Sequence, residues 1–329
     1  MKNRLVFMMV LISALLLSDC TKDEPIEEYV VTPYELTTPY GFPELIIPGD
    51  NPMTVEGVEL GRMLYYDPII DGVNTRSCGS CHVQGNAFTS VENCLTHINL
   101  AWNNAFLWNG KIEGSLEDIM MFEVEEFFET DVSKLNSNSE YSKLFREAFG
   151  TAEITSKEVA FALAQFFRTL ISSDSKFDQY QIGNATLTEA EARGLIIYFS
   201  EDGDCFHCHG TRLLTDNQFH NNGLDVSPEN GRAEITGDPN DQGKFKTPTL
   251  RNIEYSGPYM HDGRYNTLEE VIDFYSEGLL WSPTIDPLMK KVDQGGLQLS
   301  PFQKQDLLVF LKTFSDETFV VNPEYSDPF

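Results

Sequence analysis

Two short motifs constrain this chain more than any other feature of its sequence: Cys78–His82 and Cys205–His209 both follow the pattern Cys-x-x-Cys-His. Two cysteines three positions apart fit one helical turn and can reach the two vinyl groups along one haem edge. The histidine that follows then lies under the ring and can bind the iron from below. The motifs therefore predict two covalently attached c-type haems, held by four cysteines and ligated on one face by two histidines: Cys78, Cys81, His82, Cys205, Cys208 and His209.

A structural zinc site and a redox disulfide are the alternatives to haem for such a cysteine pair. Zinc requires two pairs closing on one ion, usually without a further ligand fixed beside each second cysteine. A disulfide gives the following histidine no role. Coincidence explains the pattern poorly, because one such pentapeptide arises by chance in roughly one of several hundred chains of this kind, and this chain has two. Haem is the interpretation that uses all six residues.

The N-terminal segment has the features of an export signal. Two basic residues precede an apolar run that is too short to cross a bilayer as a mature helix. Cys20 follows in a context that resembles the lipobox of bacterial lipoproteins, in which the cysteine is lipidated. The expected organisation is a signal peptide at residues 1–19 and an acidic tether at residues 20–40. The protein would then be exported and anchored by lipid in the cell envelope, facing the periplasm or the outer surface. A plain cleaved signal with an incidental Cys20 is the alternative.

The charge of the chain limits its partners. Asp and Glu number 51 against 23 Lys and Arg, which gives a formal net charge of −28. Nucleic acid and anionic membranes attract basic surfaces, so neither is an expected partner of the folded body. A membrane contact is expected only through the lipid on Cys20. An acidic surface of this kind suits a cationic partner.

The remainder of the sequence predicts helices and long loops. Helix starts with capping-box character occur at four places: Ser115, Thr188, Thr267 and Ser300. Apolar residues recur at helical spacing from Val159 to Leu170. Long loops rich in Gly, Pro and Asn occupy residues 215–250 and 278–298, and loops of this length usually carry function or wrap a ligand. The sequence therefore predicts an all-α, loop-rich chain that packs around large prosthetic groups.

Several segments between and beside the motifs add a resemblance. These are residues 60–68 before the first motif, followed along the chain by residues 99–103, 107–111, 247–252 and 256–264. In this order they resemble the bacterial di-haem cytochrome c peroxidase / MauG family, over roughly residues 50–315. The resemblance implies two cytochrome c-like haem domains packed across a shared interface. We expect an N-terminal, peroxidatic domain at residues 41–185 and a C-terminal, electron-transfer domain at residues 186–329.

The resemblance also implies different tasks for the two haems. Many family members place a distal histidine in a long loop after the first motif. Here only ten residues separate His82 from Asn93, and none of them is histidine. The first haem is therefore expected to be five-coordinate and open in the resting protein.

Peroxide cleavage over an open haem needs a group that moves a proton between the two oxygens. The glutamate that does this in the family aligns with Glu129 if one residue is inserted at Gly114. The register among Glu123, Glu125, Glu126 and Glu129 stays open, and a solvated acidic face is the alternative for most of this run. Trp108 matches the family tryptophan between the haems, which suggests an electron relay, packing or both.

Further roles carry over to the second haem and its surroundings. Tyr275 matches the position of the distal ligand of the second haem, with Met260 or Met289 as alternatives. A tyrosine ligand favours ferric and higher oxidation states, whereas methionine raises the reduction potential. Calcium between the haems would be held by residues that offer oxygen ligands, namely Asn93, Ser256 and Pro258. Arg251 and Arg264 are expected partners of the haem propionates.

The resemblance implies a peroxidase that reduces hydrogen peroxide to water. The electrons would come from a small donor protein such as a cytochrome c, for which the acidic surface is a candidate docking site. The alternatives are a MauG-like oxidase that acts on a protein partner and a non-enzymatic di-haem electron carrier. The identity of the donor and the oligomeric state, monomer or homodimer, stay open.

Overall fold

A computed structural model describes residues 29–90 and 93–329 of the chain; the predicted signal peptide, Cys20 and the first part of the acidic tether lie outside these residues. The first half contains α1 (Val55–Tyr66), η1 (Pro68–Ile70), α2 (Cys78–Cys81), η2 (Gln84–Asn86), η3 (Leu100–Trp102), β1 (Ala105–Phe106), β2 (Ile112–Glu113), α3 (Leu116–Phe122), the π-helical η4 (Glu123–Phe127), α4 (Val132–Ser137), α5 (Ser139–Phe149) and α6 (Ser156–Thr169).

The second half contains α7 (Lys176–Gln181), α8 (Glu189–Tyr198), α9 (Phe206–His209), β3 (Phe219–His220), α10 (Ala233–Thr236), η5 (Pro239–Asp241), β4 (Phe245–Lys246), α11 (Leu268–Glu277), η6 (Val292–Gln294), α12 (Pro301–Leu311), η7 (Lys312–Phe314), α13 (Glu317–Val320) and η8 (Pro323–Tyr325). The strands form two small antiparallel pairs, with Ala105 opposite Glu113 and Phe219 opposite Lys246. The described chain is therefore mostly helical, as predicted. None of its helices combines the length and the apolar character needed to cross a membrane.

The helix starts predicted from the sequence are confirmed. Capping boxes begin α3 at Ser115, α8 at Thr188, α11 at Thr267 and α12 at Ser300. In each box the hydroxyl accepts from a backbone N–H of the first turn, while the side chain three residues later accepts from the N-cap N–H. These local bonds fix where α8 and α11, the helices before and after the second motif, begin.

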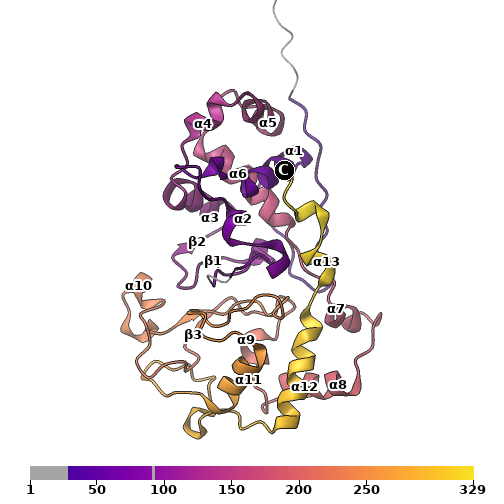
Figure 1. Cartoon of the computed structure of the whole chain (residues 1–329), viewed down its shortest axis with the longest axis vertical. Helices are drawn as coiled ribbons and strands as arrows, with labels where there is room; N and C mark the ends of the chain where they lie inside the picture. The colour runs from indigo at the N-terminus through magenta and orange to yellow at the C-terminus, as the bar shows by residue number, and fades with distance from the viewer. Residues whose placement is uncertain (1–28, 91–92) are drawn as a thin grey trace, which may run out of the picture.

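Two hydrophobic cores divide the molecule into an upper and a lower part (Figure 1). In the upper core α1 packs on α6, and in the lower core α8 packs on α12. The two helix crossings are alike, because each needs a glycine. A Cβ on Gly61 would lie 2.0 Å from the Ala162 carbonyl oxygen, and one on Gly194 would lie 2.1 Å from the Asp306 carbonyl oxygen. Only glycine permits backbones to approach so closely.

The two halves also repeat the same hydrogen bonds around their motifs. Four residues after its crossing glycine, each half has a buried tyrosine, Tyr65 or Tyr198. The Tyr65 hydroxyl donates to the His82 carbonyl oxygen at 3.2 Å, and the Tyr198 hydroxyl donates to the His209 carbonyl oxygen at 2.9 Å. The chain thus contains two structural repeats, each built around one Cys-x-x-Cys-His motif.

The last residues of the chain return to the upper half, where the C-terminus lies close to α1 (Figure 1). Phe319 joins the first core, and its ring lies 5.5 Å from that of Phe88. The Tyr66 hydroxyl donates to the Tyr325 carbonyl oxygen at 2.6 Å. The segment at residues 317–329, predicted as part of the second domain, therefore packs on the first half.

Candidate functional site

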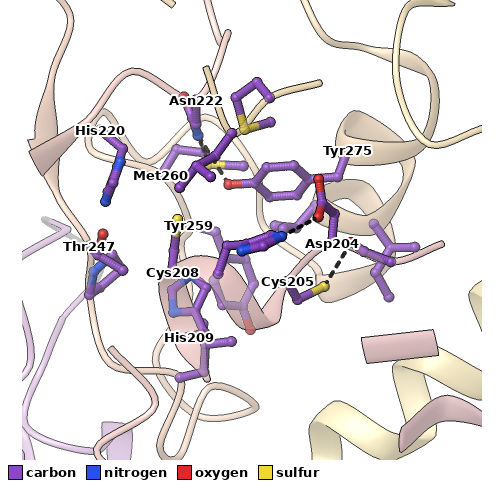
Figure 2. Close-up of a pocket in the computed structure, with 18 of the residues that line it drawn as sticks. Asp204, Cys205, Cys208, His209, His220, Asn222, Thr247, Tyr259, Met260 and Tyr275 are labelled. Atoms are coloured by element: carbon purple, nitrogen blue, oxygen red, sulfur yellow. Dashed lines mark hydrogen bonds and ion pairs between the residues drawn. The ribbon is translucent and has the colours of Figure 1, made fainter. Parts of the chain in front are cut away.

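A cavity of about 230 Å³ lies beside α9 in the lower half of the molecule (Figure 2). Cys205, Cys208 and His209 line it, together with apolar side chains from α8, α11 and α12. His209 Nδ1 lies 2.9 Å from the Leu214 carbonyl oxygen, to which it donates. Burial lowers the pKa of His209, so the neutral imidazole keeps a lone pair on Nε2. Two thiols on one helical turn beside a neutral imidazole fit the requirements of a c-type haem.

The first motif offers the same set of donors. His82 Nδ1 lies 2.8 Å from the Phe88 carbonyl oxygen, and burial lowers the pKa of His82 to about 4. A histidine that ligates a metal commonly uses its second nitrogen in this way, which fixes its tautomer and its ring orientation. Cys78 is buried, and burial raises the pKa of its thiol. The residues of the first motif therefore fit a second c-type haem.

Tyr275, on α11, lies in the wall of the lower cavity across from His209 (Figure 2). The Asn222 amide Nδ2 donates to the Tyr275 hydroxyl at 3.2 Å and lies 3.6 Å from Met260 Sδ. Burial raises the pKa of Tyr275 to about 12, and the bond from Asn222 partly opposes this shift. Met289 lines the same cavity. The structure thus brings together all three predicted candidates for the distal ligand, and the choice of Tyr275 stays a prediction. No sequence feature pointed to Asn222.

The glutamates of the acidic run between α3 and α4 differ in how far they are buried. Glu125, Glu126 and Glu129 are exposed, whereas Glu123 is half-buried at the start of the π-helical η4. Burial raises the pKa of the Glu123 carboxyl to about 7, and its charge raises the pKa of the Cys78 thiol. Glu123 therefore lies near the first motif. Glu129 follows η4 with a φ of 48°, which is unusual for a residue other than glycine. The prediction that Glu129 is the acid–base group remains a prediction.

Trp108 and Asn93 join the two halves. Trp108 lines the lower cavity, its indole Nε1 donates to the Asn93 carbonyl oxygen at 3.3 Å, and its own carbonyl oxygen accepts from the Lys246 backbone N–H at 2.8 Å. The Asn93 side-chain Nδ2 donates to the carbonyl oxygens of Met260 and His261 at 2.9 and 2.7 Å. Trp108 thus lies where an indole could relay electrons between the motifs.

Two of the three predicted calcium ligands lie close together. A Cβ placed on Gly263 would lie 3.2 Å from Asn93 Cβ and 3.3 Å from Pro258 Cγ. The hydroxyl of Ser256, the third, donates to the Ile253 carbonyl oxygen at 3.4 Å. This bond uses only the proton of the hydroxyl, so Ser256 could offer either its hydroxyl oxygen or its backbone carbonyl oxygen to a cation. Hard oxygen ligands of this kind suit calcium, which stays a proposal.

The two arginines predicted as propionate partners have other partners in the structure. The Arg251 guanidinium is buried and donates to both carboxylate oxygens of Asp178 at 2.8 and 2.9 Å. The Arg264 guanidinium donates to Asp262 and Asp225 at 2.6 to 3.1 Å. Neither residue lines the lower cavity. Both side chains already pair with carboxylates of the protein, and their role as propionate partners stays a prediction.

Lys246 is a further candidate for this task, which the sequence analysis did not name. It lines the lower cavity but is only 4% exposed, and its Nζ donates to Asn217 Oδ1 at 2.7 Å. Burial lowers its pKa to about 8. The charge of Asp216 partly opposes this shift. A buried ammonium group is costly unless anions lie nearby, and a haem propionate would provide another. Nothing in the local sequence distinguishes Lys246 from a surface lysine.

Two like motifs, each with a partly buried histidine and a supporting buried tyrosine, place this chain among the c-type haem proteins. Residues 55–186 match the family model described as di-haem cytochrome c peroxidase. The chain is 32% identical to the methylamine utilization protein MauG of Methylorubrum extorquens, over 82% of this chain and 81% of that protein. It is 30% identical to the cytochrome c551 peroxidase of Nitrosomonas europaea, over 68% of this chain and 73% of the relative.

A solved structure agrees with these relatives. The crystal structure of a MauG-like protein associated with microbial copper homeostasis superimposes with a TM-score of 0.82 and 34% identity, covering 90% of this chain and 99% of the other. The chain therefore belongs to the MauG and di-haem cytochrome c peroxidase family. The predicted resemblance is confirmed, and membership implies two c-type haems and an oxidative role.

Proposed function

We propose that this protein is an exported, lipid-anchored peroxidase that reduces hydrogen peroxide to water with electrons from a small donor protein. The observation that carries this proposal is the contrast between the two motifs. The second motif faces a phenol, Tyr275, across its cavity. The first is followed by ten residues without a histidine and has the carboxyl of Glu123 nearby. The second site thus has a candidate distal ligand, and the first has a candidate acid.

The residues of the chain divide the work accordingly. When bound, the haems supply the redox chemistry. His82 and His209 would each hold one haem, and Tyr275 would close the second site. Glu129, as the resemblance implies, moves the proton between the peroxide oxygens, and Trp108 links the two sites. Calcium held by three residues would stiffen the contact between the halves: Asn93, Ser256 and Pro258.

A MauG-like protein oxidase is the second candidate, and Tyr275 favours it. A tyrosine ligand stabilises high oxidation states, which an enzyme that oxidises a protein partner requires. The chain is also similar to two MauG proteins, at 32% and 28% identity.

Peroxide added to the purified ferric protein tests these candidates. With reduced cytochrome c present, we expect rapid oxidation of the cytochrome, because electrons enter at the second haem and are consumed at the first. The measurement is the loss of absorbance of the reduced donor over time. A long-lived oxidised protein that leaves the donor reduced would support the protein oxidase. Absence of any reaction with peroxide would support the third candidate, the non-enzymatic electron carrier.

The pH dependence of turnover should reveal the part played by Glu123. Its pKa is raised to about 7, so the carboxyl is protonated below this pH and ionised above it. If the protonated form donates to peroxide, turnover falls as the pH rises through about 7. If Glu123 and not Glu129 is the acid, Glu123→Gln should lose turnover below about pH 7 and with it this limb of the profile, while Glu126→Gln, from the exposed part of the run, should retain both. An unchanged profile in Glu123→Gln would leave the acid–base role to Glu129.

The proposed anchor depends on one residue. Cys20→Ala removes the thiol that would carry the lipid, so the variant should move from the membrane fraction to the soluble fraction of the envelope. Fractionation followed by haem staining measures this shift, with Cys94→Ala as the matched control. A Cys20→Ala protein that stays with the membrane would contradict the anchor and leave the peroxidase proposal untouched.

A further inference from the structure

His97 lies directly against the histidine of the first motif. The rings of His82 and His97 are stacked, with their centroids 3.5 Å apart and their planes 19° from parallel. The His97 ring also packs against the buried ring of Phe167 on α6, with the two centroids 4.5 Å apart and the planes tilted by 49°. His97 is thus held by the core and in turn covers one face of the His82 imidazole.

A hydrogen bond fixes His97 further. The Tyr65 hydroxyl lies 3.0 Å from His97 Nδ1 and donates to the His82 carbonyl oxygen at 3.2 Å. A hydroxyl has one proton, and a carbonyl can only accept. With that proton on the carbonyl, the Tyr65 oxygen accepts from the Nδ1–H of His97. One tyrosine therefore connects the backbone of His82 to the side chain that stacks on its ring.

The second repeat shows that this position does not require histidine. Thr96 donates from its hydroxyl to the Ala87 carbonyl oxygen, and Thr249 does the same to the Leu213 carbonyl oxygen. The two repeats share a second bond, made by the asparagine three residues after each threonine. The backbone N–H of Asn99 donates to a carbonyl oxygen after α6, and that of Asn252 donates to a carbonyl oxygen after α12. The residue that follows the threonine is His97 in the first repeat and Leu250 in the second.

The two repeats therefore differ in the residue beside the histidine that is predicted to bind the iron. A leucine in the wall of the second cavity offers only apolar contact. A stacked imidazole, itself fixed by a hydroxyl and an aromatic ring, would restrict rotation of the neighbouring His82 imidazole if His82 binds iron. Groups that orient a metal ligand from behind influence the metal site strongly even though they do not touch the metal.

We propose that His97 is a positioning residue, which fixes the plane of the His82 imidazole and gives the first haem a proximal environment different from that of the second. This inference rests on the proposed ligation of the first haem by His82. The role proposed for His97 depends on its stack on the His82 ring.

Three substitutions separate the stack from the hydrogen bond. His97→Phe keeps a flat ring and removes Nδ1, His97→Gln keeps a donor and removes the ring, and His97→Leu reproduces the second repeat. Electron paramagnetic resonance of the ferric holoprotein reads the first haem, and the signals of the second haem serve as an internal reference in every sample. Pyridine haemochrome spectra measure how many haems are attached.

We expect His97→Phe to retain one sharp first-haem signal, close to that of the unmodified protein. His97→Leu and His97→Gln should broaden or split this signal, leave the second-haem signals unchanged and lower peroxide-dependent turnover about 10-fold or more. Unchanged signals in all three variants would overturn the proposal, as would a His97→Phe protein perturbed as strongly as His97→Leu. If the unmodified protein attaches fewer than two haems, the proposed haem ligation itself fails, which is a separate result.

Discussion

Replacing Glu129 by glutamine should lower peroxide turnover by about 10²–10⁴-fold while both haems stay attached. Heterolysis of peroxide needs a proton taken from the near oxygen and delivered to the far one, and an amide cannot perform this exchange. Glutamine keeps the size of the side chain, and Glu129 is exposed, so the fold should tolerate the change. Turnover of a reduced cytochrome c measures the loss, and the pyridine haemochrome spectrum confirms two haems.

Glu125→Gln is the matched control, because Glu125 lies in the same acidic run and is also exposed. It should keep the rate of the unmodified protein. Full activity in Glu129→Gln together with a large loss in Glu123→Gln would transfer the role to the half-buried carboxyl. Full activity in both variants would remove the acidic run from the mechanism and weaken the peroxidase proposal.

Tyr275→Phe should change the low-spin spectrum of the second haem and raise its reduction potential. The phenol oxygen is the group that would favour the ferric state, and phenylalanine keeps the ring while it removes this oxygen. Spectra of the ferric protein and a redox titration measure the two effects. The donor reaction should slow as well, because a higher potential makes the second haem a poorer source of electrons for the first.

Two methionines of the same cavity provide the comparison. Met260→Leu and Met289→Leu should leave the spectrum as it is if Tyr275 is the ligand, although both side chains line the cavity. A spectrum that stays constant in Tyr275→Phe and changes in Met260→Leu would assign the ligand to Met260. Asn222 touches both candidates, so its bond to Tyr275 alone does not distinguish them.

Local features of this protein could be predicted from sequence because local chemistry decides them. A capping box joins residues three positions apart, and all four predicted helix starts were found at their predicted residues. The same holds for the two motifs, in which cysteines and histidine share one turn. The family resemblance then ordered these parts along the chain.

Side-chain partners across the fold could not be predicted in this way. Arg251 and Asp178 are 73 positions apart and meet only after α7 and the loop between β4 and α11 have packed. Glu123 differs from Glu125 only in the direction that the π-helical turn gives its side chain, and a run of acids carries no such signal. The stack of His97 on His82 likewise needs the core around Phe167.

The return of the C-terminal segment to the upper half has a consequence for the order of events during biosynthesis. His82 donates to the carbonyl oxygen of Phe88, and the Phe88 ring packs against Phe319 and Tyr325. A ribosome makes the chain from its N-terminus. Phe88 is therefore made more than two hundred residues before its aromatic partners Phe319 and Tyr325. The loop that orients His82 therefore acquires its final packing only after residues 319–325 have been made, so the first motif depends on a segment synthesised long after it.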